Sequence, residues 1–286
     1  MPKEFSRRTE FDNIRDFNPA HIFECGQCFR WLPSEDSAEG GRQVWIGASG
    51  SYAAEISYED GRLIIDSTGG DKEFWYEYFD LATDYGKIKD DLIKNEPRMK
   101  EPCEYGCGIR ILNQDLFETL ISFIISQNNN IPRIRKNIEA LCDAYGEPIG
   151  IFGGRTLHAF PTPEALAAAD VCELAELRLG YRCEYIKESS AAYLEGGAPK
   201  TREEMLEMHG VGPKVANCIM LFGLHDVAAF PIDTWVKYIM HDMYGFDEGD
   251  VKGMQRFARD KFGGYAGYAQ QYLFHYYREK GKEAGE

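Results

Sequence analysis

Long apolar runs are missing from this sequence, and their absence bears on where the protein resides. Among its 286 residues, no hydrophobic stretch approaches the roughly 18–20 residues of a membrane-spanning helix. The N-terminal segment, MPKEFSRRTEFDN, also lacks the apolar core of a secretory signal peptide. We therefore expect a cytoplasmic protein that does not associate with membranes.

Basic residues are scarce as well. The chain has 32 Lys and Arg against 47 Asp and Glu, a formal net charge of −15. This balance argues against a protein that binds nucleic acid through a broadly basic surface. Residues 119–138 and 261–278 nevertheless carry no acid, and residues 205–225 carry only Glu207. We interpret these windows as parts of one side of the molecule that faces an anion.

The eight cysteines show no spacing that makes a metal site convincing. The pairs Cys25/Cys28 and Cys103/Cys107 could supply the ligands of a structural zinc ion. Their flanking residues lack the glycine-rich turns of zinc knuckles, however, and Cys28 lies in a segment that alternates like a strand. We favour reduced thiols without a metal. No cysteine follows Cys218, which excludes a C-terminal iron–sulfur cluster.

With 44% hydrophobic and 13% aromatic residues, the chain has the composition of a globular protein. Residues 42–49, 52–57 and 62–67 alternate or are β-branched and predict an antiparallel meander, preceded by a strand around CFRWL. From about residue 71 the periodicity is helical. The pattern predicts an α+β protein, with an antiparallel β domain over 1–100 and an all-helical domain over 101–286.

Two consecutive helices are well marked in the second part. Residues 116–126 are apolar nearly all round and predict a buried central helix. The next helix begins after three asparagines with Pro132 in its first turn, where proline is tolerated, and Gly146 ends it.

A helix–hairpin–helix follows later in the chain. Thr201 and Glu204 form a capping box for a short helix that should end at His209. Gly210 and Gly212 then turn the chain, and Pro213 begins a helix that runs to about Gly223. Glycines allow close backbone approach, and the amides at such a helix N-terminus suit a phosphate. Taken alone, the pattern also fits a plain helix–helix corner.

Lys214, the second residue of that helix, is unfavourably placed as a cation, because the N-terminal end of the helix dipole is positive. It either reaches solvent or serves as a neutral amine, the form that the dipole and burial both favour. Asp233, in AFPIDTW, stands where it would cap the following helix and remain ionised.

HGVGPK (209–214) followed by Pro231-Ile232-Asp233 resembles the helix–hairpin–helix, Gly/Pro-Asp superfamily of DNA base-excision glycosylases. Further segments make the chain similar to the 8-oxoguanine DNA glycosylases of that superfamily, over about residues 20–278: GQCFRW (26–31), SQNNNIPRI (126–134), LGYRCEYI (179–186) and YAGYAQQYLF (265–274). The resemblance implies a TBP-like sheet domain, a helical glycosylase domain, and excision of 8-oxoguanine opposite cytosine from duplex DNA in base excision repair, with lyase activity at the abasic site.

The resemblance assigns the chemistry to Lys214 and Asp233. The lysine amine would attack the sugar C1′, displace the damaged base and remain as a Schiff base until β-elimination. The aspartate would stabilise the positive charge that develops on the sugar.

The resemblance also implies a pocket for the extruded base. The carbonyl of Gly26 would face N7, which is a donor in 8-oxoguanine and an acceptor in guanine. Gln270 would read the Watson–Crick edge, and Phe274 and Cys218 would stack on the two faces. A plain core aromatic is the alternative for Phe274.

On the opposite strand, the resemblance implies that Asn128, Arg133 and Arg182 contact the unpaired base, with Tyr181 as the wedge. Arginine donors suit the O2 and N3 acceptors of cytosine. Phosphate contact or plain surface exposure is the alternative for the two arginines.

One position departs from the family pattern. Trp235 stands where better-known members carry a histidine that contacts phosphate, and its indole cannot carry a charge, which puts that contact in doubt. The resemblance implies no cofactor and no required metal, although a monovalent cation could sit at the Gly210–Gly212 hairpin. We expect double-stranded DNA as the partner, a monomer, and association with the nucleoid in a bacterium or archaeon.

Two alternative functions follow from the same motifs. One is a glycosylase for alkylated bases or oxidised pyrimidines. The missing cysteine cluster argues against its iron–sulfur form, and GQCFRW with Gln270 and Phe274 argues against the others. The second is a non-catalytic DNA-structure binder, which would have no need of Lys214 paired with Asp233.

Overall fold

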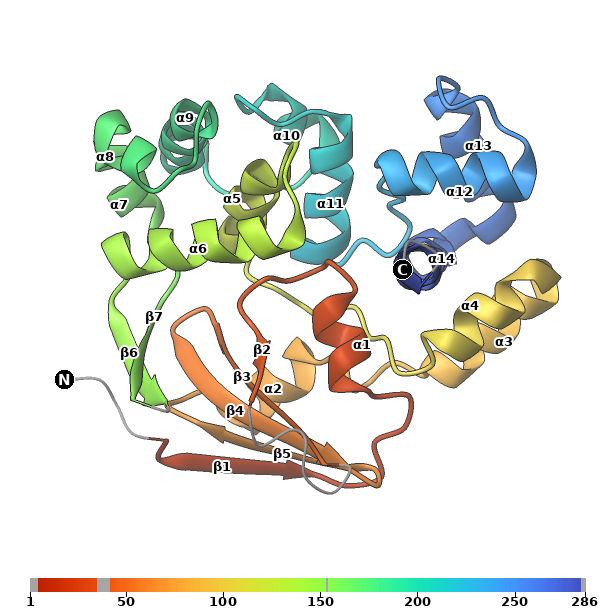
Figure 1. The fold of residues 1–286 in the computed structure, drawn as a ribbon, viewed down its shortest axis with the longest axis horizontal. Helices are drawn as coiled ribbons and strands as arrows, with labels where there is room; N and C mark the ends of the chain where they lie inside the picture. The colour runs from red at the N-terminus through yellow and green to blue at the C-terminus, as the bar shows by residue number, and fades with distance from the viewer. Residues whose placement is uncertain (1–4, 35–41, 153, 284–286) are drawn as a thin grey trace.

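An antiparallel five-stranded sheet forms the N-terminal part of the computed structural model, which describes residues 5–34, 42–152 and 154–283. The strand order is β1-β5-β4-β3-β2, with the sheet at the bottom of Figure 1. The strands are β1 (Arg7–Phe11), β2 (Leu32–Pro33), β3 (Gln43–Ser49), β4 (Tyr52–Glu59) and β5 (Arg62–Ser67).

The predicted meander is confirmed as β3, β4 and β5, but two predictions at its edges are wrong. The strand expected around CFRWL is reduced to two residues, Leu32–Pro33, and Cys28 lies outside it. Strand β1 was not predicted. It pairs with β5, so that Arg7 lies opposite Ser67, and a partner so distant in sequence leaves little local signal in a charged segment.

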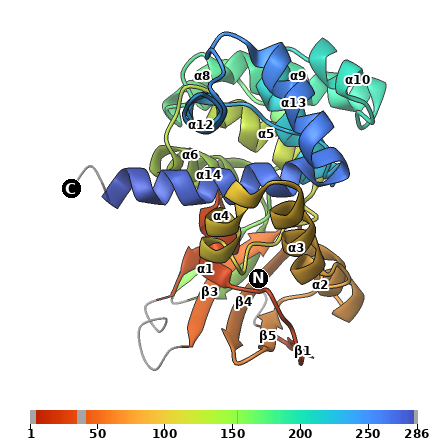
Figure 2. The same cartoon turned by 90° about the vertical axis from the view of Figure 1, so that its right-hand side faces the viewer.

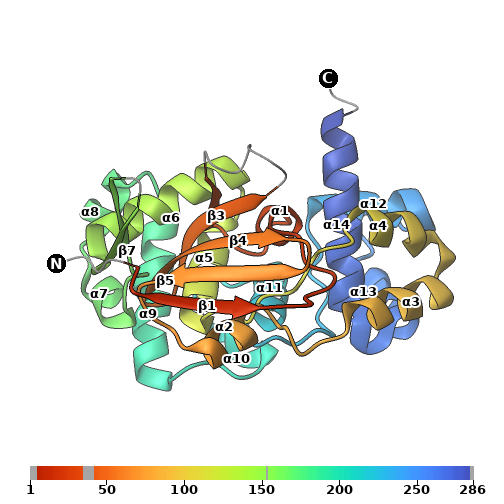
Figure 3. The ribbon, with the colours of Figure 1, turned by 90° about the horizontal axis from the view of Figure 1, so that it is seen from below.

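One face of the sheet is covered by α1 (Pro19–Glu24) and α2 (Lys72–Tyr78), whereas no helix of the described residues covers the outer face seen in Figure 3. Large aromatic side chains fill the space between helices and sheet. Phe23 stacks on Trp31 with ring centres 4.6 Å apart, and Trp75 and Phe79 pack around them. This core is separate from the core of the helical part.

The rest of the chain is mainly helical, as predicted. Its α-helices are α3 (Tyr85–Asn95), α4 (Lys100–Tyr105), α5 (Leu116–Ser126), α6 (Ile131–Tyr145), α7 (Pro163–Ala168), α8 (Val171–Glu176), α9 (Arg182–Gly196), α10 (Arg202–Glu207), α11 (Pro213–Gly223), α12 (Thr234–Tyr244), α13 (Val251–Phe262) and α14 (Ala266–Glu283). Two 3₁₀ turns, η2 (Pro97–Met99) and η3 (Gly263–Tyr265), precede α4 and α14. Within the described ranges, none of these helices combines the length and the hydrophobicity of a membrane-spanning segment.

The helix boundaries predicted from caps and glycines are confirmed for α5, α6 and α11. The capping box of Thr201 and Glu204 is present, although α10 ends at Glu207 and not at His209. The prediction of an all-helical second part is wrong over one segment, because β6 (Pro148–Phe152) and β7 (Arg155–His158) form a hairpin. This hairpin packs against β3 and β4, a long-range contact that helical periodicity cannot reveal.

Helices from both sides of residue 100 belong to the helical core. In Figure 2, α14 lies between α4 on one side and α12 on the other. Tyr85 and Leu92 of α3 and Cys103 of α4 are buried in the same cluster as α14. Cys25 and Phe29, although early in the sequence, are buried there too. Since the chain contributes to both cores before and after residue 100, the boundary at that residue stays a prediction.

Gln27 anchors the segment that crosses from the sheet core to the helical core. Its side chain is almost completely buried. The Nε2 atom donates to the carbonyls of Ile22 (2.9 Å) and Arg110 (2.7 Å), and Oε1 accepts from the amide of Leu112 (2.9 Å). The Gln27 carbonyl accepts from Gln114 Nε2 (2.8 Å). These bonds fix the loop that begins at the C-terminus of α1 against the strand-like segment before α5.

Replacing Gln27 with methionine should lower the free energy of unfolding by about 2–4 kcal/mol, because three buried backbone groups would lose a partner. Urea denaturation measures this change. The control is Asn95→Ala, which removes an exposed amide and should change the free energy by less than about 0.5 kcal/mol. Equal effects of the two substitutions would contradict an anchoring role for Gln27.

Candidate active site

The hairpin between α10 and α11 is held tightly by its neighbours. Gly210 has a φ of +83°, and a Cβ on it would lie 2.5 Å from the ring of Tyr185. Its carbonyl accepts from Gln127 Nε2 (2.9 Å), while Ser189 Oγ donates to the carbonyl of His209 (2.8 Å). Gly212 precedes α11 in extended backbone with no atom within 4 Å of its would-be Cβ. The hairpin is therefore fixed on its inner side and open at Gly212.

Lys214 occupies the first turn of α11 and is partly buried. Its Nζ donates to Ser126 Oγ at 3.4 Å and lies 5.1 Å from the centre of the Phe123 ring. The amine therefore points back over the end of α5 and not along the helix into solvent. Ser126 was not predicted as a site residue, because a hydroxyl at the end of a largely apolar helix was its only signal in the sequence.

Asp233 caps α12, as predicted. Its Oδ1 accepts from the amide of Val236 at 2.8 Å, and its backbone is extended. The helix begins at Thr234 because this carboxylate satisfies one of the otherwise unpaired amides of the first turn. The cap holds the carboxylate at a positive helix end, where negative charge is stabilised.

Cys218, one turn beyond Lys214 on α11, is influenced by both of these groups. The thiol is buried, and burial raises its pKa to about 11; the charge of Lys214 opposes this rise and that of Asp233 adds to it. Both charges are thus close enough to the same sulfur to act on it. A thiol that stays neutral over the physiological range is a small apolar wall.

The loop after α1 meets α14 at Gly26. This glycine has a φ of +80°, and a Cβ on it would lie 3.2 Å from the Phe274 ring. Gln270, one turn earlier on α14, is buried, and its Oε1 accepts from Gln271 Nε2 at 2.7 Å. The structure therefore brings Gly26 and Phe274 together from opposite ends of the chain. Phe274 and Gln270 lie on the same helix, α14.

A second cluster joins the start of α9 to the loop after α5. Asn128 Nδ2 donates to the hydroxyl of Tyr181 at 3.1 Å. The buried Arg182 donates from Nε to the carbonyl of Gln127 (3.1 Å) and from Nη1 to that of Leu179 (3.0 Å), and its guanidinium lies 4.6 Å from the Tyr181 ring. Tyr181 itself is 50% exposed. The tyrosine side chain thus projects from a loop that the hydrogen bonds of Asn128 and Arg182 hold in place.

Arg133 and Trp235 complete the predicted set, and both are exposed. Arg133 lies in the first turn of α6, and its side chain makes no hydrogen bond or ion pair within the described residues. Trp235 lies in the first turn of α12 beside Asp233, and its ring reaches α14, 2.9 Å from where a Cβ on Gly281 would stand. The indole thus packs on α14 at Gly281, where the absence of a side chain leaves room for the ring.

A cavity of about 440 Å³ adjoins Lys214. Its lining contains basic side chains from several helices and no acidic one: Arg202, Lys214, Lys252, Arg256 and Arg259, with Pro213, Asn217, Ile232, Val251 and Gln255. A pocket with this lining suits an anion.

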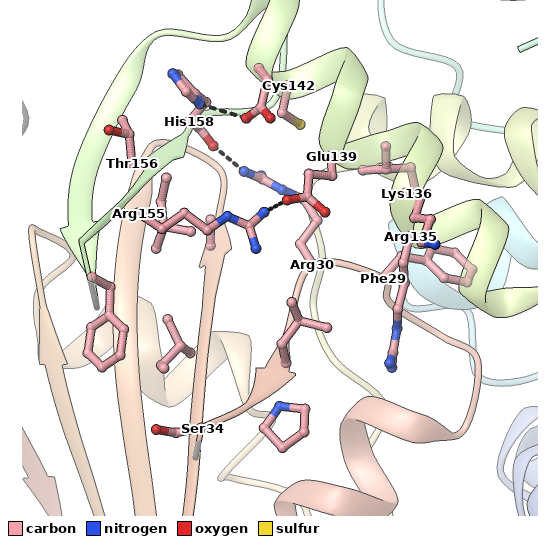
Figure 4. A pocket seen from close by; sticks show the side chains of 18 of the residues that line it. Phe29, Arg30, Ser34, Arg135, Lys136, Glu139, Cys142, Arg155, Thr156 and His158 are labelled. Carbon is pink, nitrogen blue, oxygen red and sulfur yellow. Dashed lines mark hydrogen bonds and ion pairs between the residues drawn. The ribbon is translucent and has the colours of Figure 1, made fainter. Parts of the chain in front are cut away.

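A larger cavity, of about 740 Å³, lies elsewhere, between β2, β3, α6 and the β6–β7 hairpin (Figure 4). The charged groups at its mouth pair with one another, Arg155 with Glu139 and His158 with Asp143. None of the predicted site residues lines it. Size alone therefore does not identify the site in this protein.

The described residues contain no cluster of three or more His, Cys, Asp or Glu side chains that could hold a metal ion. In that part of the chain, the cysteines that suggested a zinc site are free thiols. Burial raises the pKa of Cys25 to about 11 and that of Cys103 to about 12, so both thiols stay protonated near neutral pH.

Family comparisons match nearly the whole chain. Residues 11–120 match the model of the 8-oxoguanine DNA glycosylase N-terminal domain, and residues 121–262 match that of the HhH-GPD superfamily base excision DNA repair protein. An N-glycosylase/DNA lyase of Saccharomyces cerevisiae is 32% identical over 77% of this chain and 66% of its own length. A probable N-glycosylase/DNA lyase of Methanothermobacter thermautotrophicus is 34% identical over 61% and 65%. The chain thus spans just under two thirds of the length of these curated relatives.

Solved structures match over a larger share. The 8-oxoguanine glycosylase/lyase of Clostridium acetobutylicum, solved in complex with double-stranded DNA containing cytosine opposite 8-oxoG, has a TM-score of 0.89 and 37% identity. The match covers 98% of both chains. A structure described as MBOgg1 in complex with a low-affinity DNA ligand has a TM-score of 0.88 and 40% identity, over 96% of both chains.

The two hairpin glycines differ in a way that stability measurements can test. Gly210→Ala should lower the free energy of unfolding by about 1–3 kcal/mol, because it forces a side chain into the left-handed region and against Tyr185. Gly212→Ala is the matched control, since its φ is −89° and its would-be Cβ meets nothing within 4 Å. A Gly210→Ala protein as stable as Gly212→Ala would show that the hairpin tolerates a different backbone.

Proposed function

The chain belongs to the 8-oxoguanine DNA glycosylases of the helix–hairpin–helix, Gly/Pro-Asp superfamily, and from this membership we propose that it excises 8-oxoguanine opposite cytosine from duplex DNA and then cleaves the strand as a lyase. The observation that carries the proposal is the placement of Lys214. Its amine is held over Ser126 and Phe123, and both Lys214 and the capped carboxylate of Asp233 act on the buried thiol of Cys218. A DNA-binding hairpin alone would need none of these groups.

In the proposed reaction the lone pair of the Lys214 amine forms a bond to C1′ as the bond from C1′ to N9 breaks, and the base leaves with the bonding electrons. Loss of the nitrogen proton and opening of the sugar ring give a Schiff base. Removal of a proton from C2′ then expels the 3′ phosphate. The amine lies 5.1 Å from the centre of the Phe123 ring, and the buried thiol of Cys218 is one turn further along α11.

Asp233 is proposed to stabilise the transition state electrostatically. Positive charge grows on the sugar as the glycosidic bond breaks, and a fixed carboxylate close by stabilises it. The bond from the Val236 amide keeps this carboxylate oriented. One side chain thereby both begins α12 and stabilises the reacting sugar.

The base pocket is proposed from Gly26, Gln270, Phe274 and Cys218. The Gly26 carbonyl would accept from the N7–H of 8-oxoguanine and repel the N7 lone pair of guanine. Phe274 would stack on one face of the base and Cys218 on the other, with Gln270 at the Watson–Crick edge. Support comes from the contact between Gly26 and Phe274 and from the burial of Cys218 beside Lys214.

The unpaired cytosine is proposed to lie against Asn128, Arg133 and Arg182, with Tyr181 filling the gap left by the extruded base. Half of the Tyr181 surface is free for this role, and Arg133 has no competing partner in the described part of the chain. Arg182 already donates to backbone carbonyls of Gln127, Asn128 and Leu179, so it would order this loop while its one remaining N–H, on Nη1, faces the cytosine.

DNA phosphates are proposed to bind at the open side of the hairpin and in the basic cavity beside it. Because the Gly210 carbonyl accepts from Gln127, a monovalent cation at this hairpin would share that carbonyl with the glutamine. The reaction needs no organic cofactor. A monomer has all of these groups, and a chromosomal substrate would place the protein in the cytoplasm, on the nucleoid of a bacterium or archaeon.

The covalent step can be trapped with borohydride. A duplex carrying 8-oxoguanine opposite cytosine should give a stable protein–DNA adduct with the wild type and none with Lys214→Gln. Asp233→Asn keeps a good helix cap but should slow excision by about 100-fold, because the charge is lost. The adduct yield should be highest opposite cytosine when all four opposite bases are compared.

Other outcomes would redirect the assignment. Adducts formed only with an oxidised pyrimidine would indicate that the chain acts on a different damaged base from the one proposed. Binding without any adduct would indicate a non-catalytic DNA-structure binder. An undiminished adduct with Lys214→Gln would show that another amine is the nucleophile.

The basic cavity makes a separate prediction about DNA affinity. Lys252→Gln and Arg256→Gln should each weaken binding to duplexes of any sequence and reduce the slope of log K against log salt concentration by roughly 0.9, as expected for one lost phosphate contact. Fluorescence anisotropy at several salt concentrations measures the slope. Lys72→Gln on α2, an equally exposed lysine of the sheet domain, should leave it unchanged. Equal slopes for all variants would remove the cavity from the DNA contact surface.

A further inference from the structure

Arg278 lies one turn beyond Phe274 on α14 and is almost completely buried, with 7% of its surface exposed. Most of its guanidinium is engaged. Nη2 donates to the carbonyl of Glu24 and to Glu279 Oε1 (2.8 Å), and Nε donates to the same carboxylate oxygen (3.0 Å). These bonds hold the fork in one orientation and tie the end of α1 to α14.

The remaining nitrogen of this guanidinium has no partner. Nη1 is buried without a hydrogen bond, 3.7 Å from the position of a Cβ on Gly26. The guanidinium carbon lies 5.3 Å from the centre of the Phe274 ring. An unsatisfied buried donor on a charged group is costly, so a ligand acceptor that satisfies it would be bound more tightly.

The place where this donor lies is the place proposed for the imidazole edge of the extruded base. In 8-oxoguanine, N7 is flanked by two carbonyl oxygens, O6 on one side and O8 on the other. A base whose N7–H meets the Gly26 carbonyl must bring one of these oxygens to each side of that carbonyl. Phe274, now in contact with Gly26, would turn to stack on the base and uncover Nη1.

We propose that Arg278 is a specificity-determining residue that donates from Nη1 to a carbonyl oxygen beside N7 of the extruded base. The inference rests on the proposed function, since it takes the base to lie with N7 at Gly26. Through Nη2 and the Glu24 carbonyl, the same side chain also holds the loop that supplies the acceptor. Acceptor and donor for the lesion would thus share one support.

Two reactions of the same protein separate base recognition from folding and from DNA binding. Excision of 8-oxoguanine opposite cytosine requires the base in its pocket, whereas cleavage at a preformed abasic site opposite cytosine does not. Arg278→Met should slow single-turnover excision by roughly ten- to a hundredfold, the range for a lost hydrogen bond to a charged group. Abasic-site cleavage should stay within about twofold of the wild type, because no base is present to meet Nη1. Arg278→Lys, which keeps the charge but not the fork, should also lose excision selectively.

Lys280→Met is the matched control, because it removes one positive charge from the same helix on the side of Tyr276 and Glu101. It should change neither reaction. A duplex with 8-oxoadenine, which carries O8 and N7–H but an amino group in place of O6, identifies the acceptor. A comparable loss on both lesions assigns the bond to O8, and a loss confined to 8-oxoguanine assigns it to O6.

Three results would overturn the inference. Excision by Arg278→Met at the wild-type rate would show that Nη1 does not meet the base. Equal losses in excision and abasic-site cleavage would reduce Arg278 to a structural residue. A wild type that cleaves abasic sites but leaves 8-oxoguanine in place would overturn the proposed substrate, and with it this role for Arg278, while leaving the lyase chemistry standing.

Discussion

The candidate site depends on a buried amide that joins two cores. The side-chain Nε2 and Oε1 atoms of Gln27 both form hydrogen bonds with backbone groups, in α1 and in the segment before α5. These bonds fix the position of the neighbouring residue Gly26. Because the sheet and the helices have separate hydrophobic cores, this anchor and the bond from Arg278 to the Glu24 carbonyl together position the loop after α1 relative to α14. A polar residue is suited to this task, since hydrogen bonds specify register and direction where apolar packing specifies only burial.

The second constraint is electrostatic. The chain carries a net charge of −15 yet is proposed to bind a polyanion. The structure concentrates the positive groups: the cavity beside the hairpin is lined by five basic side chains and no acid. The hairpin adds backbone amides that need no charge. Lys214 lies at the edge of this region, but its amine points towards Ser126 and Phe123. This orientation differs from that of a lysine that only contacts phosphate.

Local patterns predicted the elements whose ends are determined by neighbouring residues. The boundaries of α5, α6 and α11 and the capping role of Asp233 follow from caps, prolines and glycines within a few positions. Strand β1 and the β6–β7 hairpin were missed because each is stabilised by a partner far away in sequence or by packing on the sheet. The contacts of Ser126 with Lys214 and of Arg278 with Glu24 were missed for the same reason: nothing in their own neighbourhoods marks a polar group whose partner is on another element.

The sequence by itself determined the family, the hairpin, and the lysine and carboxylate that are proposed to carry the reaction, because these depend on motifs read over short spans. Only the tertiary structure decided what surrounds them. It placed Gly26 against Phe274, buried the Cys218 thiol within the influence of Lys214 and Asp233, and left one nitrogen of Arg278 without a partner beside the proposed base pocket. Distances between residues some 250 positions apart, such as Glu24 and Arg278, arise from the packing of the two cores on each other, and no local pattern encodes them.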